Sequence, residues 1–319
     1  MTNILEIKDL NLFFRGENRD YQALYDVNLS FEKGKLHSIV GESGCGKTMS
    51  VMSVMRLLPK TAYIKSGEII FNGENLLNYK ESQMRELRGN KIALIPQDPM
   101  TSLNPLYTIG NQVVEAIQAH NKCSKRYALR KAKHALDMVK IPDIENKLNS
   151  YPHEFSGGMK QRVIIAMALA CNPKLIIADE PTTALDVTIQ KQIMDLISDL
   201  QKEFGMTIIL ISHDLALVSN YADTVSVMYS GHVVEKAGAK EFFSNPKHPY
   251  SQALLNSLPS ANINTKLNVI EGAPPEIQEI ITGCKFHPRC NLAETGVCDT
   301  KSPLLEEKET KHFVSCLKV

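Results

Sequence analysis

The sequence predicts an α/β protein built around a buried, largely parallel sheet. Short apolar runs alternate with helical patterns along most of the chain, which is the order of elements expected of that fold class. Each central run is also followed directly by a polar residue that can do chemistry. The chain has 319 residues, of which 43% are hydrophobic, so it is long enough for one large domain and an appendage. The core strand candidates are residues 35–40, 92–95, 175–178 and 207–211.

Flanking segments add three parts to this core. Three earlier segments have the pattern of antiparallel strands and predict a smaller second sheet; they are residues 4–14, 23–31 and 68–71. A helical pattern from Thr108 to Ala170 predicts an inserted helical subdomain at about residues 101–170. After Pro246 the content of proline, cysteine and charge rises, and the alternation of helices and strands stops. The predicted domains are residues 1–245 and 246–319.

Charge and hydropathy argue against several classes of protein. The number of Lys plus Arg residues (36) nearly equals that of Asp plus Glu (35), so the charge balance does not predict binding to nucleic acid. The chain begins with neither a basic leader nor an apolar stretch, and no apolar run reaches the roughly 18 residues needed to cross a bilayer. We therefore expect a cytosolic protein that reaches a membrane only through a partner. In that reducing compartment the seven cysteines are expected to be core residues, reactive thiols or metal ligands.

A phosphate-binding loop follows the first core strand candidate. Residues 41–48 match the pattern G-x-x-x-x-G-K-[ST] and precede a predicted helix over residues 49–58. The glycines let backbone N–H groups face phosphate oxygens, and the start of the helix adds a favourable dipole. Lys47 is expected to bridge the β- and γ-phosphates of ATP, and the Thr48 hydroxyl to bind Mg²⁺. The alternative is a glycine-rich turn without a ligand. The expected nucleotide-binding residues here are Gly41, Ser43, Gly44, Cys45, Gly46, Lys47, Thr48 and Met49.

Polar residues after the other core strand candidates supply the expected catalytic groups. Asp179 is expected to hold Mg²⁺, and Glu180 to polarise the attacking water. His213 is expected to sense the γ-phosphate, and Gln97 to contact Mg²⁺ or water. Each of these residues has a plainer interpretation as part of a solvated loop, but the phosphate loop favours the catalytic one. Because ligands bind beyond the carboxyl ends of parallel strands, we expect these loops to converge on one site.

A second candidate anion site opens the helix predicted over residues 163–170. Ser156, Gly157 and Gly158 offer free backbone donors, a hydroxyl group and the positive end of a helix dipole. Two such helix starts in one chain suggest that the second serves ATP bound to another molecule, in a head-to-tail dimer. The alternative is an N-cap serine followed by two turn glycines.

In this order, the motifs resemble those of the ATP-binding-cassette ATPases over about residues 5 to 240. The matching features are the phosphate loop, Gln97, Ser156-Gly157-Gly158, Asp179-Glu180, the Ala184-Leu185-Asp186 loop and His213. The resemblance implies that Ser156 and Gly158 bind the γ-phosphate held by a partner subunit, and that Asp186 helps to join the two sites. It also implies an aromatic residue that stacks on adenine, for which Phe14 and Tyr21 are both candidates.

Three local features narrow the resemblance to the oligopeptide and dipeptide importer ATPases. These are residues 97–105, the sequence from Phe155 to Met159, and His248-Pro249-Tyr250-Ser251. Phe155 and Met159 stand where the general family usually has Leu and Gln, which looks like a mark of the subfamily. The resemblance to the ATP-binding-cassette family also implies that Gln97 with residues 98–105 carries movement to a membrane permease.

The cysteine-rich tail extends this match. In the importer group the resemblance implies a [4Fe–4S] cluster on Cys284, Cys290, Cys298 and Cys316. Four thiolates suit such a cluster, and their spacing differs from the paired C-x₂-C steps of common zinc sites. Zinc, with His287 or His312 as spare ligands, is the second interpretation, and free structural thiols are the third. The remaining cysteines, Cys45, Cys123 and Cys171, are assigned no metal.

The expected function is ATP-driven peptide import. ATP would close a dimer with a second, homologous ATPase subunit, and this closure would change the conformation of two transmembrane permease subunits. An extracytoplasmic peptide-binding protein would deliver peptide to the permease. The resemblance implies a peripheral position on the cytoplasmic face of a bacterial membrane. Importers of nickel, oligosaccharide or glutathione are alternatives. An ATPase acting on DNA or ribosomes is a weaker alternative, because the chain has one cassette and a net charge of +1.

Overall fold

The computed structural model describes residues 2–183, 185–257 and 270–319, so Ala184 of the predicted Ala184-Leu185-Asp186 loop lies outside the described residues. The chain divides into two compact units. The first unit consists of Met1–Glu32, Leu36–Asn78 and Ile211–Val319, and the second of Lys33–Lys35 and Tyr79–Leu210. No helix in the described part of the chain is both long enough and apolar enough to cross a membrane.

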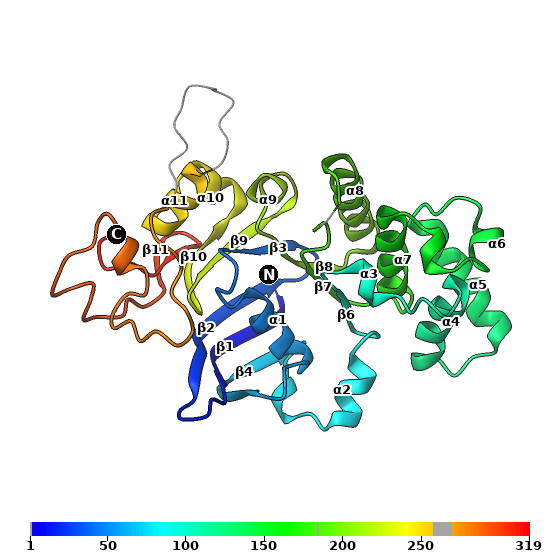
Figure 1. Ribbon diagram of the computed structural model, residues 1–319, viewed down its shortest axis with the longest axis horizontal. Helices are drawn as coiled ribbons and strands as arrows, with labels where there is room; N and C mark the ends of the chain where they lie inside the picture. The colour runs from blue at the N-terminus through cyan, green and yellow to red at the C-terminus, as the bar shows by residue number, and fades with distance from the viewer. Residues whose placement is uncertain (1, 184, 258–269) are drawn as a thin grey trace. The chain divides into compact units, whose positions relative to one another are not determined.

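The predicted small antiparallel sheet is present in the first unit (Figure 1). Its strands are β1 (Asn3–Phe14), β2 (Tyr21–Glu32), β4 (Ala62–Phe71) and β5 (Glu74–Asn75), in the order β2-β1-β4-β5, so β2 and β5 are at the edges. Buried and exposed residues largely alternate along these strands, as expected of an antiparallel sheet with one buried face.

A second set of strands in the first unit runs in the order β11-β12-β10-β9-β3. The strands are β3 (Leu36–Val40), β9 (Thr224–Tyr229), β10 (His232–Gly238), β11 (Glu306–Glu309) and β12 (His312–Val314). Only β3 and β9 pair in parallel, whereas β9 with β10, β10 with β12 and β11 with β12 are antiparallel.

The prediction of a largely parallel sheet is therefore wrong for this part of the chain, where the sheet is mixed. The reason is the connection between β9 and β10, because Tyr229 pairs with His232 and leaves only Ser230 and Gly231 in the turn. Both turn residues have positive φ, 43° and 79°, as in a type I′ hairpin. A two-residue connection can join antiparallel strands but not parallel ones.

The helices of the first unit lie against these strands, and the end of the first helix is explained by its local sequence. They are α1 (Lys47–Met55), η1 (Leu76–Asn78), α9 (Leu215–Tyr221), α10 (Ala239–Ser244), α11 (Pro249–Asn256) and η3 (His287–Arg289). The first helix is shorter than the predicted 49–58 at its carboxyl end, because Arg56 adopts the left-handed conformation (φ 50°). Its backbone N–H then bonds to the carbonyl groups of Met52 and Ser53 and closes the helix.

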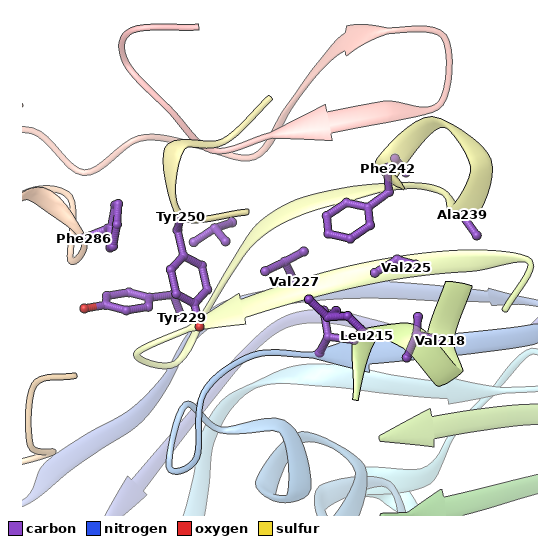
Figure 2. Packing of buried hydrophobic residues seen from close by; sticks show 12 residues of the cluster. Leu215, Val218, Val225, Val227, Tyr229, Ala239, Phe242, Tyr250 and Phe286 are labelled. Carbon is purple, nitrogen blue, oxygen red and sulfur yellow. The ribbon is translucent and has the colours of Figure 1, made fainter. Parts of the chain in front are cut away.

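One hydrophobic cluster joins the tail to the rest of the first unit (Figure 2). Leu215 of α9, Val227 of β9 and Phe242 of α10 form its centre. Tyr250 of α11 and Phe286 of the tail extend it, with their ring centroids 5.3 Å apart. The segment after residue 246 is therefore anchored by apolar packing, in addition to its strands β11 and β12.

The second unit contains the other predicted core strands and the predicted helical segment. Its strands are β6 (Ile92–Ile95), β7 (Leu175–Asp179) and, except for its last residue, β8 (Thr207–Ile211), in the order β8-β7-β6, and β6 and β7 are parallel. Its helices are α2 (Glu81–Leu87), α3 (Pro99–Ser102), α4 (Ile109–His120), α5 (Lys125–Met138), α6 (Ile144–Lys147), η2 (Pro152–Glu154), α7 (Gly157–Leu169) and α8 (Val187–Phe204). The predicted helical character of residues 108–170 is confirmed, with α4, α5 and α7 packed together.

Candidate functional site

The loop between β3 and α1 contains three glycines with positive φ, of which Gly41 and Gly44 differ most in their surroundings. Gly41 has a φ of 149°, and a Cβ atom there would lie 2.2 Å from the carbonyl oxygen of Met228. Gly44 has a φ of 77°, but no atom lies within 4 Å of the position of its Cβ. Gly41 is therefore required by close packing inside the unit. Gly44 is required only by its backbone conformation and leaves open space beside the loop.

Lys47 is held at the centre of this loop. Its Nζ donates to the carbonyl oxygens of Gly41 and Glu42, both at 2.9 Å, and lies 3.8 Å from Sγ of Cys45. The lysine side chain is buried, with 6% of its surface exposed. An ammonium group fixed among loop carbonyls at a helix start that carries no acidic residue is suited to bind an anion.

The other predicted residues of the loop divide into buried and accessible ones. Ser43 and Thr48 are exposed, and Met49 is half-buried in the first turn of α1. Cys45 is buried, and this burial raises the pKa of its thiol, so Cys45 is a packing residue and not a reactive one.

Residues of the tail contact the phosphate loop at Glu42, and the sequence did not reveal this contact. Arg289 binds the Glu42 carboxylate with two hydrogen bonds, from Nη1 to Oε2 at 2.7 Å and from Nη2 to Oε1 at 3.0 Å. The backbone N–H of Glu42 donates to the hydroxyl of Tyr250 at 2.9 Å. The only sequence signal was a charged residue within the loop motif, because Arg289 lies 247 positions away.

Other predicted residues of the first unit lie at strand and helix ends. His213 is exposed directly before α9, whose first turn is capped by Asp214. Phe14 and Tyr21 are paired residues at the ends of β1 and β2. The guanidinium of Arg19 lies over the Tyr21 ring, 5.2 Å from its centroid, so one face of that ring is already covered.

In the second unit, the structure brings together two of the predicted catalytic residues. Gln97, which follows β6, donates from Nε2 to Oε2 of Glu180 at 3.0 Å. The same oxygen accepts a hydrogen bond from Oγ1 of Thr183 at 3.0 Å. Glu180 has a φ of 47°, an uncommon conformation for a residue with a side chain. Asp179, one residue earlier at the end of β7, is 4% exposed.

The predicted second anion site of this unit is a helix start. Helix α7 begins at Gly157, six residues before the predicted position, so both glycines lie in its first turn. Ser156 is exposed and is the N-cap, since its Oγ accepts from the N–H of Met159 at 3.3 Å. A Cβ at Gly158 would lie 2.7 Å from Cγ2 of Ile189, which explains one of the two glycines by packing against α8.

Asp186 has a structural role that accounts for its residue type. It is the N-cap of α8, and its Oδ1 accepts from the N–H of Ile189 at 3.0 Å. The N-cap interpretation of Ser156 is therefore correct, and the structure shows the same capping role for Asp186. Because both side chains are exposed, capping leaves them accessible to another molecule.

The four tail cysteines line one small apolar cavity in the first unit. Burial raises the pKa values of Cys284 and Cys290, while backbone hydrogen bonds from Phe286 and Leu292 act in the opposite direction. Cys298 and Cys316 also accept backbone N–H groups, from Glu294 at 3.5 Å and Lys318 at 3.4 Å.

The two spare zinc ligands proposed for this cavity differ in position, because His287 lines the cavity and His312 does not. Nδ1 of His287 is bonded to the carbonyl oxygen of Cys284 at 2.9 Å. His312 is bonded to Glu235 and does not line the cavity.

Comparison with known proteins agrees with these motifs. Residues 24–183 match the family model described as ABC transporter, and residues 234–298 match the one described as oligopeptide/dipeptide transporter, C-terminal region. The "Probable peptide ABC transporter ATP-binding protein y4tR" of Sinorhizobium fredii is 50% identical over 316 residues, which is 98% of this chain and 94% of that protein. The "Oligopeptide transport ATP-binding protein OppD" of Bacillus subtilis is 45% identical over 320 residues, which is 99% of this chain and 89% of that protein.

A solved structure extends the likeness to the fold. The ATP-binding cassette MJ0796, in a dimeric post-hydrolysis state bound to ADP and Pi, has a TM-score of 0.66 and 27% identity, over 74% of this chain and 98% of that one. With a matching family model over half of the chain and relatives of 45–50% identity along nearly all of it, the chain belongs to the ATP-binding proteins of the ABC transporter family.

Proposed function

We propose that this protein is the ATP-hydrolysing subunit of a bacterial peptide importer. The observation that carries the proposal is likeness along the whole chain to proteins named as peptide transport ATP-binding proteins, including the tail, which matches the oligopeptide/dipeptide transporter C-terminal region. The contact between the tail and the phosphate loop also supports the proposal, because Arg289 and Tyr250 of the tail hold Glu42 of the loop in place.

The first unit supplies the groups that bind phosphate. The Lys47 ammonium exchanges the carbonyl groups of Gly41 and Glu42 for phosphate oxygens, and the N–H groups at the start of α1 bind the same charge. Phe14 and Tyr21 are both candidates for stacking on adenine; Arg19 covers one face of the Tyr21 ring, so adenine would stack on its other face. His213, exposed before α9, is assigned to sensing the γ-phosphate.

The second unit supplies the groups that act on water. Glu180 is oriented by Gln97 and Thr183, so its second oxygen is the one assigned to take up a proton from the attacking water. Thr48, Gln97 and Asp179 are the residues assigned to Mg²⁺, whose oxygen-ligand preference fits a hydroxyl, an amide and a carboxylate. When bound, Mg²⁺ neutralises charge on the transferred phosphoryl group.

A second ATPase subunit completes each site in this proposal. Ser156 and Gly158 bind the γ-phosphate held by the partner, and Asp186 lies at the junction. Two facts support these roles: Ser156 and Asp186 are exposed, and the similar cassette MJ0796 is a dimer with ADP and Pi. A homologous, non-identical partner, two permease subunits and an extracytoplasmic peptide-binding protein complete the importer. The chain would then lie on the cytoplasmic face of the membrane.

We assign a [4Fe–4S] cluster to Cys284, Cys290, Cys298 and Cys316. All four line one apolar cavity, and each is engaged by a backbone hydrogen bond of the kind that tunes a cluster.

Anaerobic affinity purification from detergent-solubilised membranes tests the proposal. Glu180→Gln, loaded with ATP, should hold the closed dimer, and mass spectrometry should find two permease subunits and a second ATPase. Recovery of ribosomal or DNA-binding proteins without a permease would overturn the transport role. A co-purifying binding protein for nickel or a sugar would overturn the peptide substrate alone. Iron and acid-labile sulfide in the purified chain test the cluster separately.

A further inference from the structure

We propose a divalent-cation site formed by Glu241, Glu309 and His312 in the first unit, separate from the nucleotide loop and from the cysteine cavity. The ligand atoms of these three side chains all lie within 4.8 Å of one another. They come from three elements: Glu241 from α10, Glu309 from the end of β11, and His312 from the start of β12. The inference goes beyond the proposed transport function and does not depend on it.

An unsatisfied nitrogen atom points to a missing ligand. His312 is 1% exposed, and its Nδ1 is a buried atom without a hydrogen-bond partner in the described structure. Its other nitrogen, Nε2, is engaged by Oε1 of Glu235 at 2.7 Å. Buried polar atoms without a partner are rare and destabilising, so a cation bound at Nδ1 would account for this one.

Glu235 has the role of an outer-shell partner for a metal-binding histidine. Its carboxylate is fully buried and accepts the N–H groups of Lys247 at 2.8 Å and His248 at 2.9 Å, in addition to Nε2 of His312. Because a carboxylate accepts hydrogen bonds, the contact with Glu235 assigns the donor role to Nε2 of His312. Nδ1 is then the atom that would hold a metal, as in the carboxylate–histidine pairs that support bound metals.

The two glutamates keep oxygen atoms available for a cation. Oε1 of Glu241 accepts from Nδ2 of Asn245 at 3.1 Å, and Oε1 of Glu309 accepts from Nζ of Lys247 at 2.7 Å. Each carboxylate has a second oxygen. Lys247 is then a competitor, because its ammonium neutralises one of the two negative charges that would attract a divalent ion.

The ligand set selects the class of metal. One imidazole and two carboxylates form a three-ligand set that leaves positions for water and suits Zn²⁺ or a similar first-row divalent ion better than a soft ion, which prefers thiolates. A metal at this place would tie β11 and β12 to α10, which packs on the core through Phe242 (Figure 2). The site is therefore assigned a structural role.

Titration of the full-length, nucleotide-free protein with Co²⁺, followed by optical absorption and by displacement with Zn²⁺, tests the proposal. Co²⁺ bound to thiolates gives an intense near-ultraviolet charge-transfer band, whereas nitrogen and oxygen ligands give only weak visible bands. We expect the wild-type protein to bind one equivalent of Co²⁺ through nitrogen and oxygen ligands, with only weak visible bands. Glu309→Gln and Glu241→Gln should each weaken it at least about tenfold, the lower end of the effect of outer-shell substitutions, without changing the thiolate band.

Two further variants make the test specific. Glu307→Gln is the matched control, because Glu307 lies on the same strand and accepts the N–H of Lys311; it should bind Co²⁺ as the wild type does. Lys247→Met should bind it more tightly, because the competing charge is gone. Binding through thiolates alone, or equal affinity in the wild type, Glu241→Gln and Glu309→Gln, would overturn the proposal. The test does not need a His312→Gln variant, which could fail to fold, because the two glutamate variants decide the outcome.

Discussion

Replacing Arg289 with methionine tests whether the tail holds the phosphate loop in shape. Methionine keeps much of the apolar stem and removes the guanidinium that binds the Glu42 carboxylate at 2.7 and 3.0 Å. The same guanidinium also donates to the carbonyl oxygens of Glu271 and Gly272, each at 3.0 Å. The hydrogen bonds to Glu42 raise the pKa of Arg289, so its guanidinium stays charged across the ordinary pH range.

The size of the effect follows from the burial of the two partners. The side chain of Arg289 is 7% exposed and that of Glu42 is 23% exposed. Removing one partner of a fully buried pair costs about 3–5 kcal/mol, and an exposed pair contributes about 0–1 kcal/mol. Because water reaches part of Glu42, we expect a loss of about 2 kcal/mol in the local stability of the loop, or roughly 30-fold in its opening equilibrium.

Hydrogen exchange followed by mass spectrometry measures this opening directly. The N–H of Glu42 is protected by its bond to Tyr250, so peptides that contain residue 42 should exchange roughly 30-fold faster in Arg289→Met. Lys308→Met is the control, because it removes an exposed ion pair to Glu306 in the same tail. Exchange of these peptides within about threefold of the wild-type rate would refute the reasoning, since the pair would then act like a surface salt bridge.

Four other predictions concern the loop, the carboxylate proposed to be catalytic and acid stability. Lys47→Ala should weaken binding of a fluorescent ATP analogue by roughly 10- to 150-fold, the equivalent of about 1.5–3 kcal/mol for a hydrogen bond to a charged group; unchanged affinity would remove Lys47 from the site. Glu180→Gln should keep ATP affinity and lower steady-state hydrolysis by about 10²–10⁴-fold, so rapid turnover would sink its assigned role. Gly41→Ala should lower the melting temperature far more than Gly44→Ala, because only the first Cβ meets backbone, at 2.2 Å; equal shifts would contradict the packing argument. Burial lowers the pKa of His232 from 6.5 to about 4, so the unfolded chain takes up the proton first as the pH falls. Its stabilising contribution is complete above pH 6.5, declines through the window down to pH 4, and has fallen by about 2 kcal/mol at about pH 5. His232→Phe should therefore unfold at lower pH than the wild type in an acid titration, and an unchanged midpoint would count against this shift.

The predicted strands and loops were correct where local sequence determines structure. The runs at β3, β6, β7 and β8 are buried along nearly their whole length, so their apolar character was visible without knowledge of their neighbours. The phosphate loop could be located because its glycines and Lys47 act within eight positions.

The features that sequence reasoning missed depend on residues far apart in the chain. The β9–β10 hairpin turns at Ser230-Gly231, a two-residue signal inside a stretch that had no predicted strand. Arg289 meets Glu42 across 247 positions, and no local pattern reveals such a pair. His312 looked like a spare zinc ligand for the cysteines, but folding places it against Glu235, 77 positions away.

Uptake of a labelled peptide by the reconstituted importer tests the central claim most directly. Proteoliposomes would contain this chain, its partner ATPase and the permease, with ATP inside and the peptide-binding protein outside. We predict ATP-dependent uptake with the wild-type chain and none with Glu180→Gln, although that variant still binds ATP. Equal uptake with both chains, or ATP hydrolysis without uptake of any peptide tested, would contradict the assignment.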